Sequence, residues 1–397
     1  MLEIPGFRLL LDCGLFQGSR DEAHRQNRDV GFDPKSLSAV LLSHAHVDHS
    51  GALPVLQKHG FSGKTYLTRA TADLTELMLE DSARVQVGDF GYVNKKEQRN
   101  GRACVRPLYD TDDVRKLVRR FEGTRYGDML KITPRVTASF HDASHILGSA
   151  AIRVKYTVRG NRTTVLFSSD LGLSNMTILR DPEPPHPCDV LILESTYDDR
   201  LHEADGEIMK QKTLDLLTHA KTHKSKIIVP AFAVGRTQEL VMWIKELVGE
   251  GSSPEDRKRL NSMKGPCVII SASGMCEGGR VVHHLKHAIQ DEANVIVFVG
   301  FQAEHTLGRK LVEGWDVVPI FGVPTPRRAQ IVKLNGLSAH ADRQDLLAYV
   351  RAIRPGPSKI FLVHGEEKQA LSLAAAIQAE QSKIEFTVPH VGSSHEV

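Results

Sequence analysis

The sequence Ser-His-Ala-His-Val-Asp-His at residues 43–49 directly follows a short apolar run, and it carries three imidazoles and one carboxylate within six residues. An apolar run that leads into such a cluster is typical of a buried strand ending in a loop of metal ligands. Because side chains at a strand-to-loop turn splay in different directions, His44 and His46 can bind one divalent ion while Asp48 and His49 bind another. The motif therefore favours a metal-dependent hydrolytic centre over a solvated polar loop.

Two ions need more ligands than this motif supplies, and three further candidates stand where other predicted strands end. His145 lies in SHILGSA, Asp170 in LFSSDLG and His364 in FLVHGEE. Because the C-terminal ends of strands gather at one edge of a sheet, we expect these side chains to share the site. The two carboxylate oxygens of Asp170 can bridge both ions.

Short β-branched runs alternate with amphipathic helical stretches along the 397 residues, which predicts an α/β layered architecture. The length suffices for two domains that each bury a core. Strands are expected at 7–11, 39–42, 65–67, 135–140, 151–156, 163–167, 190–193, 226–229, 268–270, 295–299, 329–334, 359–363 and 385–388. Helices are expected at 70–83, 113–121, 208–220, 237–247, 280–288, 344–353 and 368–379.

The composition is that of a soluble globular protein, with 41% hydrophobic and 25% charged residues. No apolar run approaches the roughly 18 residues that a membrane-spanning helix needs. The start MLEIPGFRLLLD lacks the features of a secretory leader, and the five cysteines form no C-x-x-C pair, so a cytoplasmic location is expected. The net charge of +3 does not by itself indicate a nucleic-acid binder, whereas the 19 histidines are a surplus.

The order of these motifs resembles that of the metallo-β-lactamase superfamily, with Asp12 in LLLDCGLFQG ahead of the histidine motif, His145 and Asp170. Glu194 in LILESTYDDR, His340 in LNGLSAHAD and His364 are similar to three further motifs of the β-CASP branch. That branch includes the RNA-cleaving subunit of the pre-mRNA 3′-end machinery and its bacterial and archaeal relatives. One residue departs from the family pattern: Ser144 stands where relatives commonly have glycine, and it would be strained if the position needs a positive φ.

The resemblance implies two zinc ions and a set of supporting residues. One ion would be held by His44, His46, His145 and Asp170, and the other by Asp48, His49, Asp170 and His364. Asp12 would orient a ligand histidine, and His340, paired with Glu194, would donate a proton to the leaving oxygen. From the residues alone, Asp12 is equally well explained as a carboxylate in a strand-end turn, and His340 as a neighbour of a helix cap at Asp342.

The implied fold is a four-layer αββα metallo-β-lactamase sandwich with an inserted α/β β-CASP cap. The core would comprise 1–197 and 326–397, the cap 198–325, and the cleft between them would be the substrate channel. The implied activity is zinc-dependent endonucleolytic hydrolysis of single-stranded RNA, with a hydroxide bridging two ions and attacking phosphorus. Basic segments at 94–106 and 327–333 would supply positive potential for the RNA, a membrane is not an expected partner, and a homodimer is compatible with the sequence.

Three alternatives remain at this point. A thioesterase or lactonase of the same superfamily would share the metal motifs, but it has no reason for the cap motifs with Glu194 and His340. A DNA nuclease of the β-CASP branch typically has an apolar residue in place of His364. A scaffold subunit without activity is disfavoured because every ligand position is intact.

Overall fold

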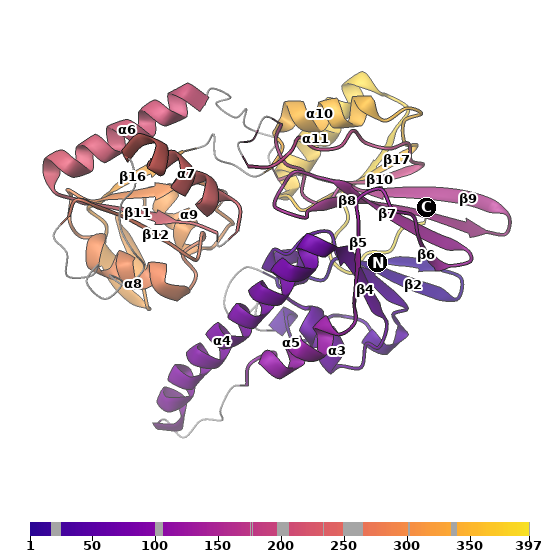
Figure 1. The fold of residues 1–397 in the computed structure, drawn as a ribbon, viewed down its shortest axis with the longest axis horizontal. Coiled ribbons are helices and arrows are strands. Elements are labelled where there is room, and N and C mark those ends of the chain that lie inside the picture. Colours follow the sequence, from indigo (N-terminus) through magenta and orange to yellow (C-terminus); the bar gives the residue numbers. More distant parts are fainter. Residues whose placement is uncertain are drawn as a thin grey trace. The chain divides into compact units, whose positions relative to one another are not determined.

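The computed structural model describes residues 1–16, 25–99, 106–174, 176, 178–196, 206–232, 234–248, 265–300, 302–334 and 340–396. The chain forms two compact units, one of Met1–Arg200 with His340–Val397 and one of Leu201–Ala339 (Figure 1). The sequence places the first domain boundary at 197/198, which lies outside the described residues, and the second at 325/326. The structure keeps residues 326–339 with the second unit, because the strand at Gln330–Lys333 pairs with the strand at Val295–Phe298 in that unit's sheet.

The first unit contains a five-stranded sheet that leads into the histidine motif. Its strands, in spatial order, are β1 (Leu2–Ile4), β2 (Phe7–Leu11), β3 (Ala39–Leu41), β4 (Lys64–Thr68) and β5 (Phe121–Thr124). The β1–β2 pair is antiparallel and the remaining pairs are parallel. Every residue of β3 is buried, as expected for a parallel strand covered on both faces. The chain leaves β3 at Leu41, and the helix α2 (Val47–Ser50) begins inside the motif.

A second, seven-stranded sheet supplies the other strand ends of the site. In spatial order it comprises β18 (Glu385–Thr387), β17 (Lys359–Val363), β10 (Val190–Glu194), β9 (Asn161–Phe167), β8 (Ala150–Val158), β7 (Val136–Asp142) and β6 (Leu130–Thr133). The strands β6 to β9 form an antiparallel meander, whereas β9, β10, β17 and β18 run parallel. The parallel strands β9, β10 and β17 therefore end at the same edge of the sheet. Asp170 lies shortly after the end of β9, Glu194 is the last residue of β10, and His364 directly follows β17.

The two sheets pack face to face, and helices cover their outer faces. Leu9 and Leu41 of the first sheet share one buried apolar cluster with Phe140 and Ile152 of the second. The outer face of the first sheet is covered by α3 (Leu53–Lys58), α4 (Arg69–Arg99) and α5 (Thr111–Val118). The outer face of the second is covered by α10 (Arg343–Ala352) and α11 (Glu367–Glu380). This order of layers is the αββα sandwich that the sequence predicts.

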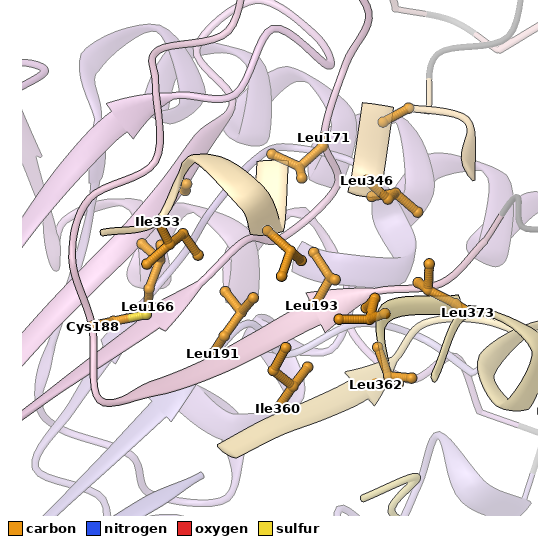
Figure 2. Packing of buried hydrophobic residues seen from close by; sticks show 14 of the residues in the cluster. Leu166, Leu171, Cys188, Leu191, Leu193, Leu346, Ile353, Ile360, Leu362 and Leu373 are labelled. Atoms are coloured by element: carbon orange, nitrogen blue, oxygen red, sulfur yellow. The ribbon is translucent and has the colours of Figure 1, made fainter. Parts of the chain in front are cut away.

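Figure 2 shows the packing under the last two helices. Leu346 of α10 and Leu373 of α11 lie in one buried cluster with Leu191 of β10 and with Ile360 and Leu362 of β17. All five side chains are fully or almost fully buried. Burial of a leucine or isoleucine side chain contributes about 1.5–3 kcal/mol, so this layer fixes β10 and β17, the strands that carry Glu194 and His364 at their ends.

The second unit is a three-layer α/β domain. Its parallel sheet has the order β12 (Cys267–Ser271), β11 (Lys226–Pro230), β13 (Val295–Phe298) and β16 (Gln330–Lys333). One face packs against α6 (Gly206–His223) and α7 (Arg236–Val248), and the other against α8 (Gly279–Ala288) and α9 (Leu307–Val312) (Figure 1). A hairpin of β14 (Val317–Ile320) and β15 (Val323–Pro326) completes the unit.

Every strand predicted from the sequence is present, with ends that differ by no more than two residues. The structure differs from the sequence prediction in two helical regions. The helix predicted at 113–121 ends at Val118, and Phe121 begins β5 instead. The segment 94–106 was expected to be an exposed excursion between helices, but α4 continues through Arg99, because lysine, glutamate, glutamine and arginine are strong helix formers; residues 100–105 lie outside the described part. Among the described residues, no helix is both long and apolar enough to cross a bilayer.

Candidate metal centre

The backbone around the histidine motif is fixed by the segment that follows β2. Cys13 N–H donates to the carbonyl of His49 (2.7 Å), and Leu15 N–H donates to the carbonyl of Val47 (2.9 Å). Gly14 lies between these bonds so close to the motif that a Cβ would stand 1.5 Å from the carbonyl oxygen of Asp48. Only glycine allows this approach, so Gly14 holds the metal-ligand loop in place.

The structure brings His44, His46, His145 and Asp170 together in a first donor cluster. His46 Nδ1 lies 3.1 Å from His44 Nε2 and 3.2 Å from His145 Nε2. Asp170 Oδ2 lies 3.6 Å from His44 Nε2 and 3.4 Å from His145 Nε2. Three imidazole nitrogens and one carboxylate oxygen thus converge on a common point, and His44, His145 and Asp170 are almost completely buried.

A second donor cluster lies on the other side of Asp170. His49 Nε2 is 3.3 Å from Asp170 Oδ2 and 3.2 Å from His364 Nε2. His364 Nε2 in turn lies 3.9 Å from Asp48 Oδ2, and His364 Nδ1 lies 3.3 Å from Asp170 Oδ1. Asp170 therefore contacts both clusters: Oδ2 lies near His44, His145 and His49, and Oδ1 lies near His364.

The distances in the two clusters fit metal ions. Tetrahedral zinc bonds of about 2.0–2.1 Å separate neighbouring ligand atoms by about 3.4 Å, close to the spacing of the nitrogens and oxygens seen here. Two imidazole nitrogens at hydrogen-bond distance can share only one proton. His46 Nδ1 lies at this distance from two other imidazole nitrogens, so its one lone pair or proton cannot form a hydrogen bond with both, whereas one ion can bind all three nitrogens. Asp170 Oδ1 is buried and accepts no hydrogen bond from the part of the chain that the structure describes. A donor set of imidazoles and carboxylates suits zinc and similar divalent transition metals.

Burial and charge act differently on the two clusters. Burial lowers the pKa of His46 to about 4, against the opposing effect of the Asp48 and Asp170 charges. Burial would also lower the pKa of His364, but the Asp170 and Asp48 carboxylates outweigh it and raise that pKa to about 9. Without an ion, His46 therefore carries a neutral imidazole, whereas His364 holds a proton that an ion must displace.

Asp12 lies where the sequence predicts it, at the end of β2, and supports both clusters. Its carboxylate accepts hydrogen bonds from Ser43 N–H (2.7 Å) and Ser43 Oγ–H (2.6 Å), and it contacts His49 Nδ1 at 2.7 Å. The last contact fixes the proton of His49 on Nδ1 and leaves Nε2 free to face the cluster. This geometry is that of a residue that orients a ligand.

Glu194 and His340 form a pair beside the two clusters. His340 Nδ1 lies 2.8 Å from Glu194 Oε2, and the two side chains are 15% and 1% exposed. The glutamate also accepts from Thr196 Oγ1–H (2.7 Å) and from Leu171 N–H. The His340 ring lies 4.6 Å, centroid to centroid, from the ring of His145. Asp342 is the N-cap of α10, as the alternative interpretation of His340 requires, but the imidazole itself is bound to Glu194.

Three hydroxyl groups that the sequence reasoning missed hold the ligands in orientation. Ser43 Oγ lies 3.0 Å and Ser169 Oγ lies 3.3 Å from His44 Nδ1, so Nε2 of that ring faces the cluster. Thr196 Oγ1, which donates to Glu194, also lies 2.8 Å from the His364 carbonyl oxygen. Each hydroxyl lies one or two residues from a predicted site residue at a strand end, and that adjacency was the available signal.

Left-handed backbone conformations gather at this centre. Asp12, Ser144, Ser169 and His364 all have φ between 52° and 58°. Ser144 has a φ of 55°, so the condition under which this serine would be strained is met. Such residues cost about 1–2 kcal/mol each, and they persist where the surroundings fix a functional geometry.

Arg327, the first residue of the predicted basic segment at 327–333, makes contacts within its own unit. The Arg327 guanidinium donates to the Trp315 carbonyl (2.9 Å) and lies 3.4 Å from the Asp316 carboxylate. Its charge therefore helps to hold the β14–β15 hairpin.

Family models match most of the chain. The metallo-beta-lactamase superfamily matches residues 1–208, the Beta-Casp domain matches 208–311, and the Zn-dependent metallo-hydrolase RNA specificity domain matches 324–389. The ligand-bearing segments that contain Asp12, the histidine motif, His145, Asp170 and Glu194 lie within the first of these matches, and His340 and His364 lie within the third.

Curated relatives support the same assignment. Ribonuclease TTHA0252 of Thermus thermophilus is 33% identical, in an alignment that covers 94% of this chain and 91% of the relative. The transcription termination factor FttA of Methanocaldococcus jannaschii is 30% identical, over 95% of this chain and 66% of the relative, and FttA of Pyrococcus abyssi is 28% identical, over 86% and 59%. This chain thus spans about two thirds or less of the length of the FttA proteins. The chain belongs to the β-CASP branch of the metallo-β-lactamase superfamily of metal-dependent hydrolases.

Proposed function

We propose that this protein is an endoribonuclease that hydrolyses phosphodiester bonds of single-stranded RNA with two zinc ions. The observation that carries the proposal is the pair of donor clusters joined by Asp170, with the Glu194–His340 pair next to them. The named relatives and the RNA specificity domain support RNA as the substrate class.

In this proposal, His44, His46, His145 and Asp170 hold one zinc ion, and Asp48, His49, Asp170 and His364 hold the other. Zinc bound at such sites makes water a nucleophile near neutral pH and neutralises charge on the phosphate. Asp12 keeps His49 Nε2 directed at its cluster, and the hydroxyls of Ser43 and Ser169 do the same for His44.

His340 is proposed to protonate the leaving oxygen. Its Nδ1 is occupied by Glu194, which fixes the ring and leaves Nε2 as the atom that can exchange a proton with substrate. A small-molecule hydrolase would have no use for this pair, because a thiolate or a strained lactone needs less help to leave. The presence of His364 in the second cluster favours RNA over DNA as the substrate.

The test compares four substrates: a circular single-stranded RNA, a DNA circle of the same sequence, a thioester and a lactone. A circle has no end, so its cleavage identifies an endonuclease. We expect the zinc-loaded protein to cut the RNA circle alone, Asp170→Asn to lose that activity, and a control at the exposed His59, His59→Ala, to keep it. Hydrolysis of the thioester or lactone with RNA untouched would establish the small-molecule alternative, and cutting of the DNA circle would establish the DNA nuclease.

RNA is proposed to be held mainly through its phosphates. Binding of RNA to the Asp170→Asn variant should then weaken steeply as salt rises and depend little on base sequence. Binding that is insensitive to ionic strength would contradict phosphate recognition. A homodimer also stays a prediction, which sedimentation of the purified protein would test.

A further inference from the structure

A separate group of potential metal ligands lies at the end of β7, outside the two catalytic clusters. The β7-end cluster consists of His141, the last residue but one of β7, with Glu183 and His186 from the loop that precedes β10. His141 Nδ1 lies 2.8 Å from His186 Nε2 and 3.0 Å from Glu183 Oε1. His186 Nε2 and Glu183 Oε1 are 3.3 Å apart, so the three atoms form a small triangle.

The ligand types and distances in this triangle are similar to those in the two donor clusters around Asp170. There, too, imidazole nitrogens contact one another at 3.1–3.2 Å, with a carboxylate oxygen at 3.3–3.6 Å. Two imidazoles and one carboxylate are an established ligand set for zinc, with a fourth position left for water. We propose that His141, Glu183 and His186 bind a third divalent transition-metal ion, of the zinc class, whose role is to fasten the 181–187 loop to β7.

The loop presents its two ligands in a rigid form. Its sequence, Asp-Pro-Glu-Pro-Pro-His-Pro at 181–187, places proline on both sides of Glu183 and of His186, and proline restricts the backbone. Glu183 N–H donates to the Asp142 carbonyl at the end of β7 (2.8 Å), and the Arg153 guanidinium donates to the Pro187 carbonyl (3.0 Å). Little conformational entropy is therefore lost when an ion binds, because the loop is already held at both ends.

The protonation of the cluster also suits an ion. His141 Nε2 contacts Ser139 Oγ at 2.9 Å, and if the ring proton lies there, the Nδ1 lone pair faces the triangle. Burial lowers the pKa of His141, against the effect of its contact with Glu183. Burial would raise the pKa of Glu183, but its contacts with His141 and His186 outweigh burial and lower it. The His141 Nδ1 lone pair and the Glu183 carboxylate are thus the donor groups that face the centre of the triangle.

Expansion by a few tenths of an ångström would bring the triangle to the spacing of about 3.4 Å that a tetrahedral ion requires. The side chains of Glu183 and His186 are 36% and 32% exposed, whereas that of His141 is 9% exposed. The two loop residues can therefore move outward while His141 stays fixed, and the fourth position faces water.

The experiment measures zinc per chain by elemental analysis after equilibration at a buffered free zinc concentration. The proteins are the full parent chain, His186→Ala, Glu183→Gln and, as a matched control at an exposed histidine outside every donor cluster, His390→Ala. We expect the two cluster variants to bind one zinc ion fewer per chain than the parent and than His390→Ala. Loading with Co²⁺ should likewise give a visible absorption band that is weaker in both variants.

Equal zinc content in the parent and in both cluster variants would overturn the proposal. The His186 side chain is partly exposed, and glutamine has nearly the same shape as the glutamate it replaces at 183, so both variants should fold like the parent. Circular dichroism spectra that match the parent would show that any loss of zinc reflects the loss of a ligand. The experiment compares the zinc content of proteins whose two donor clusters around Asp170 are identical. Failure of the two-zinc catalytic proposal would change the total zinc content but not this difference.

Discussion

Alanine variants of His340 and His364 distinguish the role of a proton donor from that of a metal ligand. The two imidazoles are near neighbours, with ring centroids 5.9 Å apart, and both can be grouped with Asp170 as potential metal ligands. We predict that His340→Ala keeps its zinc and loses activity, whereas His364→Ala loses both. The reason is that His340 Nδ1 is bound to Glu194, while the nitrogens of His364 lie 3.2 Å from His49 Nε2 and 3.3 Å from Asp170 Oδ1.

The structure gives a magnitude for each effect. A positioned general acid is worth about 10²- to 10⁴-fold in rate, or about 2.7–5.5 kcal/mol of activation free energy. In His340→Ala the buried Glu194 carboxylate keeps its bonds from Thr196 and Leu171 and loses one of three. The free energy of unfolding should therefore fall by about 1–3 kcal/mol, which leaves the protein folded.

Glu194→Gln should resemble His340→Ala in kind. Oε1 of Glu194 accepts from Leu171 N–H, and Oε2 faces Thr196 and His340. A glutamine has one carbonyl oxygen, so its NH₂ group must face a donor on one side. If the NH₂ faces His340, it donates to Nδ1 in place of accepting from it, and in either orientation the negative charge that supports a proton on Nδ1 is lost.

The assay is the cleavage rate of labelled single-stranded RNA across the pH range, with zinc per chain measured on the same samples. A His340→Ala protein that loses zinc as His364→Ala does would refute the reasoning, because His340 would then be a ligand. Cleavage by His340→Ala at the parental rate at every pH would refute it equally.

Other predictions follow from single contacts. Asp12→Asn should weaken zinc binding about 10- to 100-fold in a zinc titration, since one amide oxygen cannot accept both from Ser43 N–H, which bonds Oδ1, and from His49 Nδ1, which contacts Oδ2; unchanged affinity would contradict this. Ser144→Gly should raise the free energy of unfolding by up to about 1 kcal/mol in a urea titration, because relief of a φ of 55° outweighs the added chain entropy; a loss of stability would count against it. Burial raises the pKa of the Cys188 thiol to about 12, so in the folded protein at pH 8 it should react with a thiol reagent only after unfolding, and rapid labelling of the native state would contradict this.

The sequence was sufficient for most of the fold because its strands are long enough to show a pattern. Buried runs of five or more residues such as 359–363 give a clear signal. The strands β1, β5, β6, β14 and β15 were not predicted. Each has only three or four residues, and unlike the equally short β3 and β13 they are not continuous buried runs.

The donor residues were predictable for a different reason. His44, His145, Asp170 and His364 each follow a strand, and the packing of the two sheets brings the ends of those strands to one site. For the supporting contacts, the sequence offers only the adjacency to a candidate site residue, and adjacency does not show which atom a hydroxyl such as that of Ser169 contacts. Nor could any local pattern show that His141 meets Glu183 and His186, since 42 residues and two strands separate the first pair.

The measurement that tests the central claim most directly is the cleavage of a circular single-stranded RNA as zinc is added back to the metal-free protein. The His186→Ala variant is the suitable chain, because zinc then loads the two catalytic clusters without the β7-end cluster. We predict no cleavage without metal, and a rate that rises to its plateau only as zinc approaches two ions per chain. Cleavage by the metal-free protein, a plateau at one ion, or an intact circle at full zinc occupancy would contradict the account.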